Sequence, residues 1–384
     1  MGRLKPSVVL QPQAFRKDLR AKQAKAVINK SIPALLASDA RARKGVAGAE
    51  LIADPPPNER PLEEGQCMDR QQESPPFEVS IHAEDTITAA LRLYAGTPSS
   101  GTGRVGILNM ASPLRPGGGV LNGATSQEEF LCVRTTLYPS LQESFYRLPE
   151  IGGVWTPDVL IFRDGGPEGN NLAKGDRVYV GVVSAAMLRF PELEEGGRAY
   201  SNSGETEMVE KKMRAVMRVF QARNLESVVL GAWGCGAYGN PVEEIAKAWR
   251  KVLRPDKDAK EKRITERPKE SWSGIRRVVF AINDINTARE FAKHFGEELI
   301  VENVAPEDVD QRTLDQNDRA IEELKSRIAG LEAQIPEART ELLKHRLQEI
   351  LTGLKLQVAG RMAASEHSGH SGAAHTVEAG SSEY

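Results

Sequence analysis

The middle of the chain alternates short apolar runs with amphipathic segments. The apolar runs predict strands, and the segments with apolar residues at helical spacing predict helices. The predicted strands are residues 77–82, 104–110, 158–164, 177–186, 226–233 and 276–284. The predicted helices are residues 85–94, 126–141, 205–224, 241–253 and 286–295. Strands that alternate with helices in this way are typical of an α/β layer architecture.

The segments before this alternation predict an accessory helical region. Residues 13–45 carry apolar side chains at roughly helical spacing and stop at Gly45. We therefore expect residues 1–53 to form an N-terminal helical extension that packs on the core. Residues 54–76 are rich in proline and polar residues, which predicts a surface loop. The core itself is expected to span residues 77–305.

A second helical region is predicted near the C-terminus. Apolar residues keep a spacing of three and four from Ile321 to Leu342, with Pro336 inside the stripe. We expect C-terminal helices over residues 306–360, either as a hairpin within one chain or as a coiled coil that allows self-association. The stripe changes register after Leu342, which favours the hairpin. Residues 361–384 are rich in Ser, Gly and His and are expected to be disordered.

Charge and cysteine content narrow the class of protein. The 384 residues include 51 basic and 53 acidic side chains, a net charge of −2, so no nucleic-acid-coating surface and no sequence-specific nucleic-acid binding are expected. Three widely separated cysteines, Cys67, Cys132 and Cys235, fit neither a disulfide framework nor a CxxC zinc site. No apolar run reaches membrane-spanning length. We expect an intracellular protein, nuclear or cytoplasmic in a eukaryote, without a membrane partner.

Two glycine-rich loops carry the candidate chemistry. "RPGGGVLNGATSQEEF" (115–130) and "GAWGCGAYGN" (231–240) each leave a predicted strand and enter a predicted helix. Bare backbone amides beside the positive end of a helix can bind phosphate oxygens. Tight turns that serve only packing would explain either loop alone, whereas the pair favours a diphosphate held from two sides at strand ends. Ser126 is the predicted N-cap, with Glu129 three residues later.

Two other motifs are set aside. "GTGRVG" (101–106) matches the dinucleotide-binding pattern, but a loop precedes it and a strand follows it, which is the wrong context. Cys235 has no histidine in an obvious partner motif, so a small residue in a tight turn is favoured over a nucleophile. No cluster of Cys, His and carboxylates in the core has metal-ligand spacing, so neither a metal nor another cofactor is expected.

Both loops carry a family resemblance. "NMASPLRPGGGVLNGATSQEE" and "LGAWGCGAYGN" resemble the signatures of poly(ADP-ribose) glycohydrolases of the compact bacterial and fungal type, in which GGG is followed, after seven residues, by QEE. "PDVLIFRD", "VGVVSAA" and "FAIND" resemble core strands of that family, so the likeness covers about residues 13 to 300. It implies a macrodomain-like three-layer α/β/α fold with a mixed central sheet.

The resemblance also implies roles for single residues. Gly117, Gly118 and Gly119 would line the diphosphate and the ribose that carries the scissile bond. Glu129 would be the catalytic acid, and Glu128 would hold the ribose hydroxyls or orient the bound chain. Ser112 stands where the macrodomain N-x-A-N segment has its second Asn, and Tyr238 would lie against the distal ribose. The further residues expected to bind substrate are Asn109, Ser112, Val120, Gln127, Gly234, Cys235, Gly236, Ala237, Tyr238 and Asn240.

The implied activity is cleavage of ribose–ribose O-glycosidic bonds, with ADP-ribose and poly(ADP-ribose) on modified proteins as partners. Ordinary glycosidases use two separated carboxylates, a geometry that adjacent helical residues do not present. We therefore expect Glu129 to act first as acid and then as base. Two alternatives stay open. One is a hydrolase for mono-ADP-ribosylated protein or a related ADP-ribose derivative, and the other is a module that binds ADP-ribose without cleaving it.

Overall fold

The computed structural model describes residues 13–57, 77–96, 104–194, 196–254, 270 and 272–301, together with scattered positions between 321 and 359. The chain separates into two compact units, Met1–Glu302 and Asn303–Tyr384. Parts of the predicted proline-rich loop (58–76), with Cys67, and the predicted tail (361–384) lie outside the described residues.

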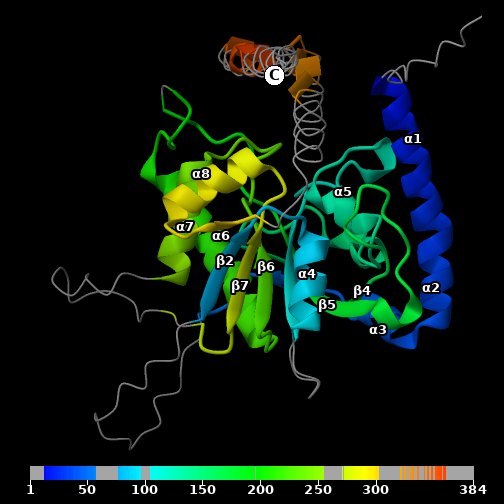
Figure 1. Ribbon diagram of the computed structural model, residues 1–384. Helices are drawn as coiled ribbons and strands as arrows, with labels where there is room; N and C mark the ends of the chain where they lie inside the picture. Colours follow the sequence, from blue (N-terminus) through cyan, green and yellow to red (C-terminus); the bar gives the residue numbers. More distant parts are fainter. Residues whose placement is uncertain are drawn as a thin grey trace, which may run out of the picture. The chain divides into compact units, whose positions relative to one another are not determined.

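The first unit is built on one mixed sheet of eight strands, in the order β1-β4-β5-β3-β6-β7-β2-β8 (Figure 1). The strands are β1 Glu50–Ala53, β2 Glu78–His82, β3 Val105–Met110, β4 Gly152–Ile161, β5 Val178–Ala185, β6 Ser227–Leu230, β7 Arg277–Ala281 and β8 Leu299–Ile300. Strand β4 runs antiparallel to its neighbours β1 and β5, and the other pairs are parallel. The carboxyl ends of β5, β3, β6, β7 and β2 therefore meet at one edge, which we call the carboxyl edge.

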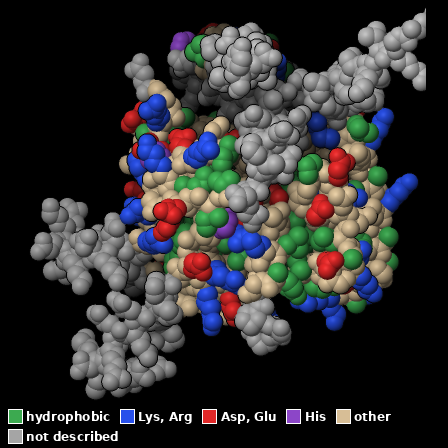
Figure 2. Space-filling model, in the orientation of Figure 1, with side chains coloured by type: hydrophobic (Ala, Val, Ile, Leu, Met, Phe, Trp, Pro, Cys, Tyr) green, Lys and Arg blue, Asp and Glu red, His purple; other side chains and the backbone are tan. Residues whose placement is uncertain are grey.

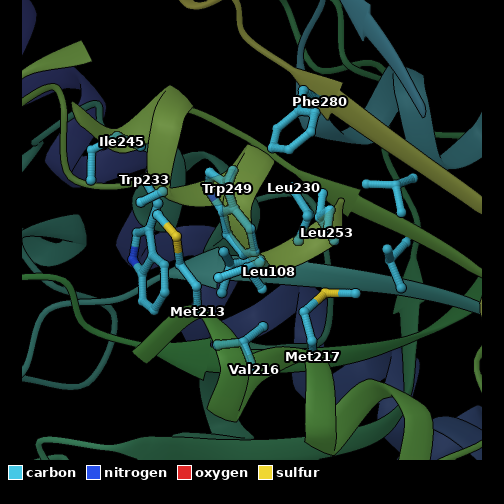
Figure 3. Close-up of a cluster of buried hydrophobic side chains, with 14 of the residues drawn as sticks. Leu108, Met213, Val216, Met217, Leu230, Trp233, Ile245, Trp249, Leu253 and Phe280 are labelled. Atoms are coloured by element: carbon cyan, nitrogen blue, oxygen red, sulfur yellow. The ribbon is translucent and has the colours of Figure 1, made fainter. Parts of the chain in front are cut away.

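Helices cover both faces of this sheet, so the predicted α/β layers are confirmed. Helices α6 Ser203–Ala222, α7 Val242–Leu253 and α8 Ile285–Phe295 lie on one face (Figure 1). Helices α4 Thr86–Ala95 and α5 Gln127–Cys132 lie on the other. Neighbouring strand residues divide between the two cores: Leu108 packs with α6 and α7, whereas Ile107 packs with α4 and α5. Figure 3 shows the first of these cores, in which Leu108 and Phe280 meet Trp249 and Met213.

The N-terminal region is helical and ends in strand β1. It consists of α1 Gln13–Ala26, a π-helical turn Val27–Ser31, α2 Ile32–Ser38 and α3 Ala40–Ala47. Helices α2 and α3 are separated at Asp39, whose backbone is extended. Its carboxylate caps α3 by accepting from the Ala42 amide at 2.9 Å. Strand β1 then adds an edge to the sheet, which the apolar pattern did not predict because three of its four residues are exposed.

Two predicted elements have different bounds in the structure. The helix predicted over 126–141 ends at Cys132, because the chain then turns to the sheet: the Thr136 amide donates to the Leu160 carbonyl at 3.0 Å, and the Leu160 amide donates to Thr136 Oγ1 at 2.9 Å. The strand predicted from residue 158 starts at Gly152. It passes Pro157 through a bulge between Thr156 and Val159, so the proline does not end it.

In the second unit, the described positions from Ile321 to Ala359 are helical except for a turn at Ile335 and Pro336. An ion pair of 2.8 Å joins Lys355 to Glu332 across that turn. The pairing of the two sides is that of a hairpin within one chain. Over the part of the chain described here, no helix combines the length and apolarity needed to cross a membrane.

Candidate active site

Both glycine-rich loops open at the carboxyl edge, since they follow the parallel neighbours β3 and β6. They also approach each other: the Tyr238 hydroxyl of the second loop donates, at 3.4 Å, to the carbonyl of Ala111, which lies between β3 and the first loop. A Cβ atom added to Gly231 would contact Met110 Cε of β3 and would lie 3.0 Å from the Ala281 carbonyl oxygen of β7, so the end of β6 is closely surrounded here. The two sequence motifs are therefore one site.

The glycines of the first loop bring its backbone against two carboxyl groups. Gly117 and Gly118 have φ values of 64° and 57°, in the left-handed region that favours glycine. A Cβ atom on Gly118 would lie 2.6 Å from Glu129 Oε1 and 2.8 Å from Glu128 Oε2. The run of glycines is thus explained by close approach, because a side chain at Gly118 would occupy the place of both carboxyl groups.

Glu129 is held by the loop on one side and by its own helix start on the other. Its side chain is only 6% exposed. Oε1 accepts from the Gly119 amide at 2.7 Å, and Oε2 accepts from the Ser126 hydroxyl. Ser126 is the N-cap residue of α5, as predicted, but its side chain caps no amide. The predicted capping box is therefore wrong in one respect: the two side chains bond to each other.

Glu128 lies in a drier environment than Glu129. It is 2% exposed, and its Oε2 accepts from the Ser112 amide at 2.7 Å. Burial, together with the nearby charge of Glu129, raises the pKa of Glu128 to about 8. The two adjacent glutamates therefore differ in kind: Glu128 keeps its proton at neutral pH and serves as a neutral hydrogen-bonding group.

The comparisons with known proteins bear on this geometry. Residues 43–164 match the family model of the microbial-type PARG catalytic domain. The matched segment includes β3, the first glycine loop and α5. No curated protein gives a match to the chain.

The fold is shared with the solved structure of one enzyme, and a second structure shows a weaker similarity. The poly(ADP-ribose) glycohydrolase of Thermomonospora curvata is 21% identical with a TM-score of 0.53, over 72% of this chain and 100% of that one. Its complex with the inhibitor ADP-HPD gives the same four values. The poly(ADP-ribose) glycohydrolase (PARG) of Deinococcus radiodurans in complex with ADP-ribose is 21% identical over 75% of this chain and 98% of that one, with a TM-score of 0.43.

Two of the side chains predicted to bind substrate make hydrogen bonds within the site. The Gln127 amide is used by β3: its Oε1 accepts from the Met110 amide and its Nε2 donates to the Leu108 carbonyl, both at 2.9 Å. Asn240 is buried, donates to the Leu188 carbonyl at 2.8 Å and accepts from the Tyr200 hydroxyl at 2.9 Å. These two side chains fix the starts of α5 and α7.

The other predicted residues divide between the interior and the loop surface. The side chains of Asn109 and Val120 are buried, and Asn109 Nδ2 donates to Ser184 Oγ at 3.0 Å. Burial raises the pKa of the Cys235 thiol, which does not suit it as a nucleophile. Gly234, with φ of 85°, and Gly236 and Ala237 form the second loop up to Tyr238. Among the described residues, no three His, Cys, Asp or Glu side chains are grouped so as to hold a metal ion.

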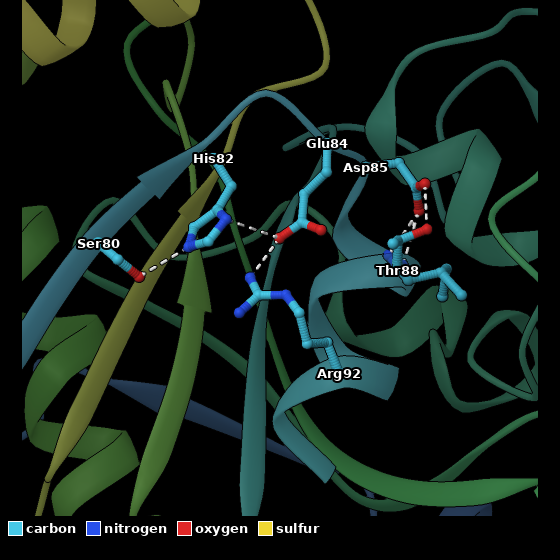
Figure 4. Close-up of polar contacts among 7 residues, drawn as sticks. Ser80, His82, Glu84, Asp85, Thr88 and Arg92 are labelled. Atoms are coloured by element: carbon cyan, nitrogen blue, oxygen red, sulfur yellow. Dashed lines mark hydrogen bonds and ion pairs between the residues drawn. The ribbon is translucent and has the colours of Figure 1, made fainter. Parts of the chain in front are cut away.

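A polar cluster at the end of β2 was missed from the sequence. Figure 4 shows Glu84 between His82 and Arg92, with Glu84 Oε1 at 3.7 Å from His82 Nδ1 and 2.5 Å from Arg92 Nη2. His82 Nε2 lies 3.0 Å from Ser80 Oγ. Burial and the charge of Arg92 lower the pKa of His82 to about 4, so the ring is neutral. Asp85, the N-cap residue of α4, accepts from the Ile87 and Thr88 amides at the same turn.

Proposed function

We propose that this protein is a poly(ADP-ribose) glycohydrolase that cleaves ribose–ribose O-glycosidic bonds and releases ADP-ribose. The observation that carries the proposal is the pair of carboxyl groups, Glu128 and Glu129, packed against Gly118 at the carboxyl edge. The family match over residues 43–164 and the fold shared with solved poly(ADP-ribose) glycohydrolases support the same activity.

ADP-ribose would lie across the two loops. The Gly118 and Gly119 amides donate to the Arg115 carbonyl and to Glu129, so the first loop offers the ligand a close backbone wall beside the carboxyl groups, at the edge where ligands bind in open α/β sheets. The distal ribose, which carries the scissile bond, then lies beside Glu129 and Tyr238, and the diphosphate lies between the loops. Glu128, being neutral, can both donate to and accept from the ribose hydroxyls. It does so without placing a negative charge beside Glu129.

Glu129 carries out the proton transfers. In its protonated form it gives the proton to the leaving 2′-oxygen, while the bond from that oxygen to the anomeric carbon breaks and the electron pair stays on the oxygen. The oxocarbenium-like centre that develops is stabilised by the neighbouring diphosphate of the substrate. Water then adds to the anomeric carbon and loses a proton to the Glu129 carboxylate. The products are ADP-ribose and a polymer shorter by one unit, and Glu129 is protonated again.

The experiment that tests this function compares three substrates and follows the products by chromatography. Labelled poly(ADP-ribose), protein with a single ADP-ribose and ADP-ribose alone are each incubated with the full chain. We expect free ADP-ribose from the polymer. Release from the singly modified protein alone would support the mono-ADP-ribosyl hydrolase instead, and binding of ADP-ribose with no release from either substrate would support a binding module.

A further inference from the structure

Helix α1 packs on the first glycine loop, from which it is far removed in sequence. Arg20 Nε of α1 donates to the Gly123 carbonyl at 2.9 Å, across 103 positions of the chain. Gly123 has φ of 76°. A Cβ atom added to it would overlap the Lys17 carbonyl oxygen and would lie 3.2 Å from the Ala21 amide nitrogen. The glycine therefore lets the backbone of the loop approach the backbone of the helix.

This contact accounts for most of the packing of α1. Besides the helical segment that follows it in the chain, α1 packs chiefly on the 3-10 helical turn Val120–Asn122 of the loop. Of residues 17–26, only Ala24 is buried, and it belongs to the same core as Val120. Lys22 lies on the exposed side, and Figure 2 shows basic side chains along the edge where Figure 1 has α1 and α2. A helix that buries so narrow a side contributes little to the core of the domain.

The loop connects this contact to Glu129 through its own hydrogen bonds. The Gly119 carbonyl accepts from the Asn122 amide at 2.9 Å and from the Ala124 amide at 3.2 Å. These two amides stand on either side of Gly123. The Gly119 amide donates to Glu129 Oε1 at 2.7 Å. The residue that holds Glu129 is therefore itself held by the turn on which α1 packs.

The packing around Gly119 leaves little room for the turn to move alone. A Cβ atom added to Gly119 would lie 2.8 Å from Ala124 Cβ and 3.5 Å from Glu129 Oε1. Val120, the next residue, is 2% exposed. Close-packed groups transmit a displacement to their neighbours. A shift of the backbone at Gly123 would therefore reach the carboxyl group of Glu129.

We propose that α1 positions the first glycine loop for catalysis, with Arg20 and Gly123 as the positioning residues. This inference rests on the proposed function. The contact with α1 keeps the Gly119 amide where it orients Glu129 toward the scissile bond. Helix α1 supplies no group to the reaction, so its contact acts on the rate of the chemical step and leaves substrate binding unchanged. The helix lies outside residues 43–164, the segment that matches the family model.

Two variants break the contact from opposite sides, and each has a control. Gly123→Ala places a methyl group against the Lys17 carbonyl, and Arg20→Ala removes the donor to Gly123. Gly197→Ala is the control for the glycine, because its φ is 70° and the atom nearest to its added Cβ is 4.0 Å away. Lys22→Ala is the control for the arginine, because Lys22 is exposed on the same helix.

The first assay measures kcat and KM for poly(ADP-ribose). We expect kcat to fall about 10- to 100-fold in Gly123→Ala, as for a displaced catalytic group, and up to about tenfold in Arg20→Ala, as for one lost hydrogen bond. KM should change less than about threefold in both. Arg20→Lys can still donate to the Gly123 carbonyl and should recover most of the loss. The double variant Arg20→Ala/Gly123→Ala should lose no more than Gly123→Ala alone, because both changes break one contact.

The second assay does not depend on turnover. Amide hydrogen exchange over residues 115–125, followed by mass spectrometry, should be about three- to tenfold faster in Gly123→Ala and Arg20→Ala, because the loop opens more often once α1 is displaced. Strand β3 should exchange as in the unaltered protein, which verifies that the fold is kept. The two controls should match the unaltered protein in both assays.

Other outcomes would overturn the role of α1. Unchanged exchange over residues 115–125 would mean that the helix does not hold the loop. Losses that multiply in the double variant would mean that Arg20 and Gly123 act separately. A raised KM with unchanged kcat, or equal losses in the controls, would exclude a positioning role. If the unaltered protein released no ADP-ribose from polymer, the proposed function would be rejected, and the exchange measurement would still decide whether α1 holds the loop.

Discussion

Replacing Gly118 by alanine tests why the first loop consists of glycines. Its φ of 57° disfavours any side chain. Its added Cβ atom would lie 2.6 Å from Glu129 Oε1 and 2.8 Å from Glu128 Oε2. Contacts of this length are below those that real Cβ atoms make, so the loop or both carboxyl groups must move.

The two effects have different sizes. Placing an L-residue in the left-handed region costs about 1–2 kcal/mol of stability, which a folded domain of this size tolerates. A displacement of about 1 Å of a catalytic group costs roughly 100-fold in rate. We therefore expect Gly118→Ala to fold, to lose about 1–2 kcal/mol in its free energy of unfolding, and to turn over polymer about 100-fold more slowly.

The assay measures release of ADP-ribose at saturating polymer, together with unfolding in urea. Gly197→Ala is the matched control, because Gly197 has φ of 70° but its added Cβ atom would have its nearest neighbour, Leu193 Cδ1, 4.0 Å away. It should lose stability without losing rate. The reasoning is refuted if Gly118→Ala keeps a rate within about threefold of the unaltered protein, or if both variants lose rate equally.

Three further predictions concern pH, the C-terminal unit and metals. The pKa of Glu128 rises from 4.5 to about 8 on folding, so between these pH values the folded state retains a proton that the unfolded state releases. The free energy of unfolding should therefore fall as the pH rises through this range. Urea unfolding of Glu128→Gln should lack this fall, and the same pH dependence in the variant and the unaltered protein would contradict the prediction. Deleting residues 310–384 should leave polymer cleavage intact and lower solubility, and a dimer lost on deletion would favour a coiled coil over the hairpin. Since Glu129 needs no Lewis acid, turnover should survive a chelator, and rescue by a divalent ion would refute the single-carboxyl mechanism.

The regular part of the fold was predictable because its elements bury one face each. Strand β3 and helices α6 and α8 have apolar periodicity that matches the structure to within two residues at each end. Strand β1 was not predictable in this way, since an edge strand with exposed side chains carries no such pattern. The helix predicted over 126–141 ends at Cys132 because long-range hydrogen bonds to β4 determine that end, and local propensity does not contain them.

The contact between the glycine loop and the two carboxyl groups was predictable from the sequence, whereas the hydrogen bonds inside this candidate site were not. The glycines and carboxyl groups stand close together in sequence, so the loop and Glu129 could be paired from residue types and order. The hydrogen bond from Asn109 to Ser184 joins positions 75 residues apart, so the local sequence could not predict it. The different environments of Glu128 and Glu129 depend on which face of α5 is covered.

The central claim is that Glu129 supplies and recovers the proton, and Glu129→Gln tests it most directly. The amide keeps the shape of the carboxyl group and can still accept from the Gly119 amide, so ADP-ribose should bind with an affinity within about threefold, measured by titration calorimetry. The rate of ADP-ribose release from polymer should fall about 10²–10⁴-fold, which is the contribution of a general acid–base group. A folded Glu129→Gln that releases ADP-ribose within about threefold of the unaltered rate would contradict the account.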